Sequence, residues 1–281
     1  MLHETLCKAV REFILIGGLP EAINAWIEHK SFISVAQVQN DLLATYRDDF
    51  AKSATRANKE RLGEVLQAVP NMLGNKFQYS KVNSNIQSSV VKNALELLLT
   101  ARIVHKVSSC DATGLPLKAT INQKLFKTLL LDIGLVSALL KLSLSPKILS
   151  DDFSLQNSGG IAEQFVGQII LASQPFYQEP EIYYWAREHK NSSAEIDYII
   201  QHANKMIPIE VKAGTTGTLR SLHLLVGLRE LDFAVRINND LPSLVAVNTI
   251  NALKQPTKFR LLSLPFYLTG QLSRLIDLCD K

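Results

Sequence analysis

Two short runs rich in β-branched and apolar residues, at residues 194–200 and 206–212, most constrain the fold of this chain. Such runs are typical of β-strands. The polar segment between them, residues 202–205, has the length and composition of a tight turn. The sequence therefore predicts a β-hairpin at this point.

The register of this hairpin would bring acidic residues together. With the turn centred on residues 203–204, Asp197 lies opposite Glu210, and Glu195 lies opposite Lys212. Directly opposed Cβ atoms are only about 5 Å apart, so two carboxylates there need a proton or a cation between them. The hairpin thus indicates a site for a hard metal ion, although simple surface pairing of Lys212 with Glu195 would also explain two of the four residues.

A predicted helix before the hairpin carries another acidic residue, Glu163, at the margin of its apolar face. A carboxylate that points partly inward needs a partner. This helix, a predicted strand at residues 182–185 and the hairpin give the order α-β-β-β. The apolar residues that recur at helical spacing are Ile161, Phe165, Val166, Ile169 and Ile170.

Composition indicates an ordinary globular protein that is long enough for two domains. Of its 281 residues, 47% are hydrophobic and 20% are charged. No apolar run of about 18 residues and no secretory signal occur, so we expect a cytoplasmic chain without a membrane partner. The three cysteines, Cys7, Cys110 and Cys279, are far apart and fit neither a disulfide framework nor a zinc site.

Positive charge is concentrated in the middle third of the chain. The net charge of +4 is small, but residues 52–127 contain 12 Lys and Arg against 4 Asp and Glu. This asymmetry indicates an anionic partner, although a solvated lysine-rich face would give the same counts.

The same region has the pattern of a winged helix-turn-helix. We predict a helix over residues 58–73, a second that starts near Ser80, and a third over residues 90–99. A wing strand at residues 101–109 would follow. In DNA-binding versions of this fold, the third helix enters the major groove.

The outward residues of the third helix would be Ser89, Lys92, Asn93 and Glu96, which offer few groups for reading bases. Winged helices also contact proteins, so duplex DNA and protein both stay open as partners. The basic residues available for phosphates are Lys81, Lys92, Arg102, Lys106 and Lys118.

A set of motifs in a fixed order resembles the signatures of a domain of unknown function. That domain forms the C-terminal half of many small bacterial and archaeal AAA-type ATPases. The motifs occupy residues 17–21, 41–50, 124–135, 163, 195–197 and 209–212.

The resemblance implies an ATPase domain as a partner in cis or in trans. No Gly-x-x-x-x-Gly-Lys-Ser/Thr motif occurs in the chain, so we expect no nucleotide site within it. The chain would then be a shortened form, a split gene product or a natural remnant.

Asp197 followed by Glu210-x-Lys212 also resembles the core of the PD-(D/E)xK nuclease superfamily, which includes restriction enzymes and Holliday-junction resolvases. The resemblance implies that Glu163, Asp197 and Glu210 hold Mg²⁺ or Mn²⁺, and that Lys212 orients or activates water. The chain would be a metal-dependent DNA phosphodiesterase. The alternative is a non-catalytic DNA- or protein-binding regulatory module whose acidic cluster is residual.

We therefore predict an α+β protein that ends in an α/β restriction-endonuclease-like domain. Asp132 is expected to cap a helix that begins at residue 133. Strands are also expected at residues 233–237, 243–247, 261–264 and 266–268, the last two at the sheet edge, with a closing helix over residues 272–279. The predicted parts are a helical region (1–57), a winged helix-turn-helix-like domain (58–143), a linker (144–160) and the PD-(D/E)xK nuclease-like domain (161–281).

Overall fold

The chain folds into two compact units. The computed structural model describes all residues except 1, 54–55, 143–157, 190–191, 215–217 and 280–281, so most of the predicted linker lies outside the described residues. The first unit, which we call the sheet unit, comprises residues 1–7, 107–126 and 152–281. The second, the helical unit, comprises residues 8–106 and 127–151.

The N-terminal part of the chain is helical, as predicted. Gly17, with φ of +80°, follows the first helix, and Pro20 begins the second. The helices of this part are α1 (Leu2–Ile16), α2 (Pro20–His29), α3 (Phe32–Ser53), α4 (Arg56–Ala68), α5 (Ser88–Thr100) and α6 (Ile133–Leu139).

Asp132 caps α6, as expected, and its carboxylate also reaches a distant loop. Its Oδ1 accepts a hydrogen bond from the Gly134 N–H at 2.8 Å, and its Oδ2 accepts one from the Gly18 N–H at 2.7 Å. A Cβ atom on residue 17 would lie 2.0 Å from Asp132 Oδ1. Two segments that carry the expected family motifs are therefore in direct contact, and a glycine is needed at position 17.

The predicted helix-turn-helix is present only in part. The inward residues of the third helix, Val91, Leu95 and Leu98, are buried in α5 as expected. The predicted second helix is wrong, because residues 79–81 form only a short 3₁₀ turn. The Asn83 side chain, which accepts from the Asn85 N–H at 3.0 Å, stabilises a turn in place of a longer helix.

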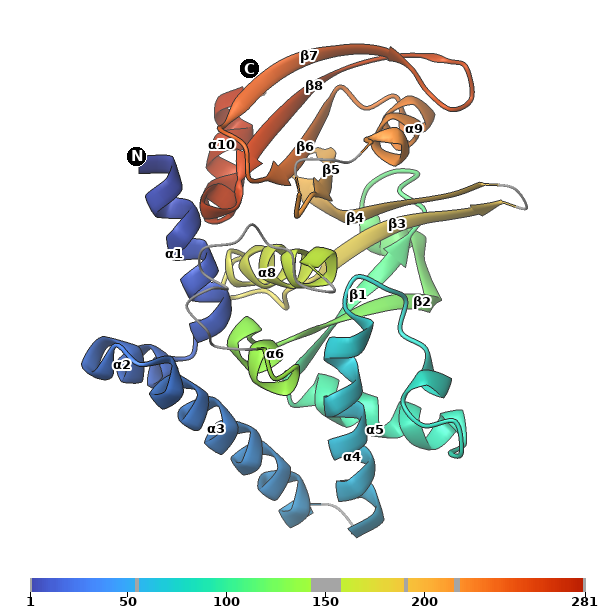
Figure 1. Cartoon of the computed structure of the whole chain (residues 1–281). Helices are drawn as coiled ribbons and strands as arrows, with labels where there is room; N and C mark the ends of the chain where they lie inside the picture. Colours follow the sequence, from blue (N-terminus) through green and yellow to red (C-terminus); the bar gives the residue numbers. More distant parts are fainter. Residues whose placement is uncertain (1, 54–55, 143–157, 190–191, 215–217, 280–281) are drawn as a thin grey trace. The chain divides into compact units, whose positions relative to one another are not determined.

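An eight-stranded mixed sheet makes up the C-terminal part of the fold (Figure 1). In the described residues its strand order is β2-β1-β3-β4-β5-β6-β8-β7. The strands are β1 (Val104–Cys110), β2 (Ile121–Leu130), β3 (Ile182–His189), β4 (Ser192–His202), β5 (Lys205–Val211), β6 (Phe233–Asn238), β7 (Ser243–Ile250) and β8 (Pro256–Pro265).

Strand directions divide the sheet into antiparallel and parallel parts. β4 is antiparallel to both of its neighbours, β3 and β5, whereas β6 is parallel to both β5 and β8. The predicted wing strand is β1, which lies between β2 and β3 and is parallel to β3. β8 is not an edge strand as predicted, because β7 covers it, and residues 266–268 belong to a 3₁₀ helix.

Helices pack against this sheet (Figure 1). Apolar residues of α9 (Arg220–Arg229), among them Leu222 and Leu225, form one buried cluster with Ile196 and Ile199 of β4. The unit also contains α8 (Ser158–Ala172) and the closing helix α10 (Leu272–Cys279), which has its predicted bounds. Among the described residues, no helix is long and apolar enough to cross a membrane.

Candidate functional site

The predicted hairpin forms, and its register is the predicted one from the turn to Tyr198. The ladder described between β4 and β5 ends there, so the predicted pairs of Asp197 with Glu210 and of Glu195 with Lys212 are not part of it. Tyr198 of β4 pairs with Ile209 of β5, and His202 pairs with Lys205 next to the turn. Ala203 in the turn has a φ of 51°, in the left-handed region that a two-residue turn requires. The next residue on each strand, beyond the pair of Tyr198 and Ile209, is one of the predicted acidic site residues: Asp197 on β4 and Glu210 on β5.

Asp197 lies in a β-bulge at this end of the hairpin. Two β3 residues, Tyr183 and Trp185, pair with Ile199 and Ile196, so three steps on β4 match two on β3. The bulge allows Ile196 and Ile199 to enter the same apolar cluster although they are three residues apart. It also changes the direction of the residues between them.

The Asp197 carboxylate accepts a hydrogen bond that a main-chain carbonyl would accept in a regular ladder. Pro208 has no N–H, so its pair with Ile199 is of the non-hydrogen-bonded type, and hydrogen-bonded pairs alternate with such pairs. By this alternation, the N–H of Val211 would next meet the main chain of Ile196. Instead, it donates to Asp197 Oδ2 at 2.7 Å. The carboxylate is thereby fixed beside the end of β5.

Glu210 and Lys212 form an ion pair at the same end of β5. Their Oε1 and Nζ atoms are 2.6 Å apart, Glu210 is only 5% exposed, and Lys212 is half-buried. Two residues that are two apart on one strand share a face. Lys212 thus pairs with the residue two positions before it on β5, and Glu195 pairs in the ladder with Ala186 of β3.

Glu163 joins these residues from α8. The hydroxyl of Tyr198 donates to the Glu163 main-chain carbonyl at 2.7 Å, which fixes α8 against the hairpin. Burial, with the charges of Glu163 and Asp197, raises the pKa of Tyr198 well above its ordinary value. Its phenol therefore stays neutral and keeps this donor.

Three carboxylates act on the Lys212 ammonium. Burial alone would lower the pKa of Lys212, but the hydrogen bond and charge of Glu210, with the charges of Asp197 and Glu163, raise it overall. The structure therefore places Glu210 in contact with Lys212, and Asp197 and Glu163 near enough for their charges to act on it. We call Glu163, Asp197, Glu210 and Lys212 the Lys212 cluster.

The Lys212 cluster contains the right kind of ligand atoms for a divalent metal ion. In this structure, however, these atoms are not arranged to bind one. Carboxylate oxygens suit Mg²⁺ and Mn²⁺. Among the residues that the structure describes, however, no three His, Cys, Asp or Glu side chains are grouped closely enough to hold an ion. The cation in contact with Glu210 is the Lys212 ammonium, so a metal would have to compete with it.

Arg236 of β6 lies beside this cluster and was missed by sequence reasoning. It pairs in register with Glu210 of the parallel strand β5, and its Nε donates to Ser263 Oγ at 3.2 Å. Arg236 is the only charged residue of β6, and its place among apolar residues 233–237 was the available signal. Nearby, the hydroxyl of Ser221 in the first turn of α9 accepts a hydrogen bond from the Glu195 N–H at 3.4 Å.

The basic residues proposed to contact phosphates are divided between the two units. Lys81, Lys92, Arg102 and Lys106 belong to the helical unit, and Lys118 belongs to the sheet unit. Lys92 is exposed on α5, on the face predicted to point outward. Lys118 is paired with Glu181, and this interaction raises the pKa of Lys118.

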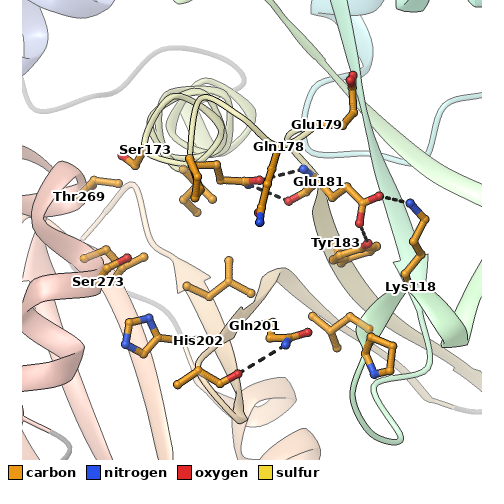
Figure 2. A pocket seen from close by; sticks show the side chains of 18 of the residues that line it. Lys118, Ser173, Gln178, Glu179, Glu181, Tyr183, Gln201, His202, Thr269 and Ser273 are labelled. Atoms are coloured by element: carbon orange, nitrogen blue, oxygen red, sulfur yellow. Dashed lines mark hydrogen bonds and ion pairs between the residues drawn. The ribbon is translucent and has the colours of Figure 1, made fainter.

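A cavity of about 540 Å³ lies at the other end of the hairpin, beside its turn (Figure 2). Glu181 on its wall accepts hydrogen bonds from Lys118 and from the Tyr183 hydroxyl (Figure 2). Gln174 holds the main chain of Glu181 through two hydrogen bonds, at 2.7 and 2.9 Å. Among its lining residues, only Lys118 was predicted to be functional, so this cavity is separate from the Lys212 cluster.

Comparison with protein families identifies two domains of unknown function in the chain. Residues 7–145 match the model described as Domain of unknown function (DUF8612), and residues 158–267 match Domain of unknown function (DUF4143). The second domain is commonly associated with AAA-type ATPases, which agrees with the resemblance seen in the sequence. The Lys212 cluster lies within the DUF4143 segment. The comparisons with curated proteins and with solved structures found no match.

Proposed function

We propose that the sheet unit is a PD-(D/E)xK-type domain that cleaves DNA phosphodiesters with the help of a divalent metal. The order of α8, β3, β4 and β5, followed by the helix α9 and the parallel strand β6, supports this proposal. The observation that carries it is the buried ion pair of Glu210 with Lys212 at the end of β5, where Asp197 is held by the Val211 N–H and the charges of Asp197 and Glu163 also act on Lys212. Three carboxylates around one ammonium leave a surplus of negative charge, which favours a further cation.

The residues of the cluster would then have distinct roles. The three carboxylates would have to move closer together, and the Lys212 ammonium away from Glu210, for Glu163, Asp197 and Glu210 to hold Mg²⁺ or Mn²⁺. The ion would then supply positive charge at the phosphate. Because its pKa is raised, Lys212 stays protonated near neutral pH. It therefore cannot accept a proton from water in this arrangement, and its role is to donate a hydrogen bond that orients water or the phosphate.

A second candidate is a regulatory module without catalysis. It is favoured by the ion pair of Glu210 with Lys212, because the lysine already neutralises the charge of Glu210, the buried carboxylate of the cluster. The association of DUF4143 with AAA-type ATPases supports an ATPase domain as the partner of either form, in cis or in trans. In both forms, the basic residues of the helical unit would contact duplex DNA.

Thermal unfolding with Mn²⁺ separates the two candidates. A metal that binds only the native state raises the melting temperature by mass action. For a metal-dependent enzyme, Mn²⁺ should raise the melting temperature of the wild type, and Asp197→Asn should abolish the rise. If Lys212 permanently replaces the metal, only Lys212→Ala should respond.

A nicking assay on supercoiled DNA with Mn²⁺ completes the test. Wild type should nick, whereas Lys212→Ala, purified in parallel, should not. Equal nicking by both proteins would indicate a contaminating nuclease. Metal binding without any nicking by the wild type would reject the catalytic proposal and leave the regulatory module.

A further inference from the structure

Strand β7 is an exposed and uncharged edge. In the described sheet it has a neighbour only on one side, β8. Leu244 is 46% exposed, Val245 51% and Ile250 70%, and the strand contains no charged residue and no proline. Proteins usually protect a long edge strand with lysine, proline or a covering element, because its open backbone groups can pair with another strand.

The outward backbone groups of β7 can be assigned from its pairing with β8. The Asn251 N–H donates to the Gln255 carbonyl at 3.0 Å, so this is a hydrogen-bonded position. The next pair, Ile250 with Pro256, is then non-hydrogen-bonded, which agrees with the missing N–H of proline. By alternation, the N–H and C=O groups that point away from β8 belong to Leu244, Ala246, Asn248 and Ile250.

We propose that β7 pairs with β7 of a second copy of this chain, antiparallel and about a two-fold axis at Val247. In this register Leu244 lies opposite Ile250 of the second copy, and Ala246 lies opposite Asn248 of the second copy. All four outward-facing residues then find hydrogen-bonding partners, so every open position of the strand is used. The two sheets become one continuous sheet with an isologous interface.

The side chains of β7 and the charged residues next to it favour a second copy of this chain as the partner that pairs with the strand. Leu244 and Ile250, both exposed, lie on the same face of β7 and would cover each other across the axis. The strand is preceded by Asp240 and followed by Lys254, both exposed. Antiparallel pairing brings the end of the strand that follows Asp240 next to the end that precedes Lys254 of the second copy, so unlike charges flank the joint; Asp240 also contacts Asn238 and Arg236 of its own chain. The edge is thus complementary to itself in hydrogen bonding, in apolar cover and in charge.

A disulfide trap tests the register. At a two-fold axis through Val247, Val247→Cys meets its own copy in a non-hydrogen-bonded pair, where side chains are close enough for a disulfide. Val245→Cys is the matched control, because it lies on the same face but its copy would be roughly 14 Å away. Both are made with Cys7→Ser and Cys279→Ser, since only Cys110 is a buried thiol.

We expect covalent dimers from Val247→Cys under mild oxidation and almost none from Val245→Cys. Equal cross-linking of the two variants would show that β7 associates without a defined register, and it would overturn the proposal. The proposal would also be overturned if Val247→Cys failed to form cross-linked dimers.

Molar mass in solution gives an independent readout. Wild type should have twice the mass of the 31.3 kDa chain, and Ala246→Lys, which places an unpaired charge at the joint, should shift it toward the monomer. Ala172→Lys adds the same charge at an exposed alanine at the end of α8 and should stay dimeric. A monomeric wild type, or a dimer unaffected by Ala246→Lys, would contradict the proposal.

Discussion

Asp132 Oδ2 accepts a hydrogen bond from the Gly18 N–H at 2.7 Å, across 114 positions of sequence. The same carboxylate caps α6, and Gln39 donates to the carbonyls of Leu15 and Ile16 just before the loop. These buried polar contacts give a structural reason for the glycines after α1. Gly18 of the motif at residues 17–21 and Asp132 of the motif at residues 124–135 thus contribute to the fold of the helical unit.

Gly17→Ala should destabilise the protein strongly. The added methyl group would collide with Asp132 Oδ1, and φ of +80° is strained for alanine, so we expect a loss of roughly 2–4 kcal/mol. Gly63→Ala is the matched control. It lies in α4 with open space around its Cβ position, and should stabilise by about 0.5–1 kcal/mol. Urea unfolding at one fixed protein concentration measures both; equal effects would contradict the steric argument.

Asp197→Ala should cost more stability than Asp197→Asn. The asparagine oxygen can still accept the Val211 N–H, whereas alanine leaves that donor without its acceptor, at a cost of about 1–3 kcal/mol. Urea unfolding without added metal isolates this structural term. If the two variants were equally stable, Asp197 would have no part in holding the end of β5. Asp197→Asn is therefore the better variant for tests of metal binding.

Alkaline pH should weaken the wild type more than Lys212→Met. The pKa of Lys212 is raised above 10.5 in the folded state, so its stabilising contribution is complete below the unfolded pKa. It is lost as the pH rises through the folded pKa. We expect the difference in urea midpoint between the two proteins to change above about pH 10.5 and to stay constant from neutral pH up to that point. Lys92→Met, on an exposed surface, controls for the loss of one positive charge.

Duplex DNA should bind the chain with an affinity that falls steeply with salt. Each phosphate contact contributes a log-log slope of about 0.9, so Lys92→Glu should weaken binding and reduce the slope by about one unit. Lys141→Glu makes the same charge change at another exposed lysine of the helical unit and should have little effect. Fluorescence anisotropy over a salt series measures both. Binding that is insensitive to salt would favour a protein partner.

The local sequence was sufficient to predict the hairpin and its register next to the turn. It was not sufficient to predict the structure at the other end of the hairpin, near Asp197. Polar residues 202–205 between two apolar runs determine the turn, and with it the register from Tyr198 to His202. The bulge at Asp197 could not be predicted, because it depends on how β4 pairs with β3 and not on the pattern within β4. The four residues of the Lys212 cluster were predicted from their motif, and the ion pair of Glu210 with Lys212 came from the structure.

Errors arose where local composition and tertiary context disagree. The apolar residues after Pro265 suggest a strand, but Thr269 donates to the Phe266 carbonyl at 2.8 Å and closes a 3₁₀ turn. Residues 101–109 suggest a wing, and the strand they form lies inside the large sheet. Arg236 was missed because its relation to Glu210 depends on parallel pairing across a helical connection, which no spacing rule detects.

The pairing of β1 with β3 limits how this chain can be divided into fragments. Val107 is paired with Ile182, and Ser109 with Tyr184, although the two strands fall in different matched segments. A fragment that starts at residue 158 would lack β1 and expose the hydrogen-bonding edge of β3 as well as that of β7. Cut at 267, it would also lose α10. The bounds of the two matched segments therefore do not coincide with those of the compact units, and a fragment that keeps the sheet around the Lys212 cluster complete has to include residues 107–126.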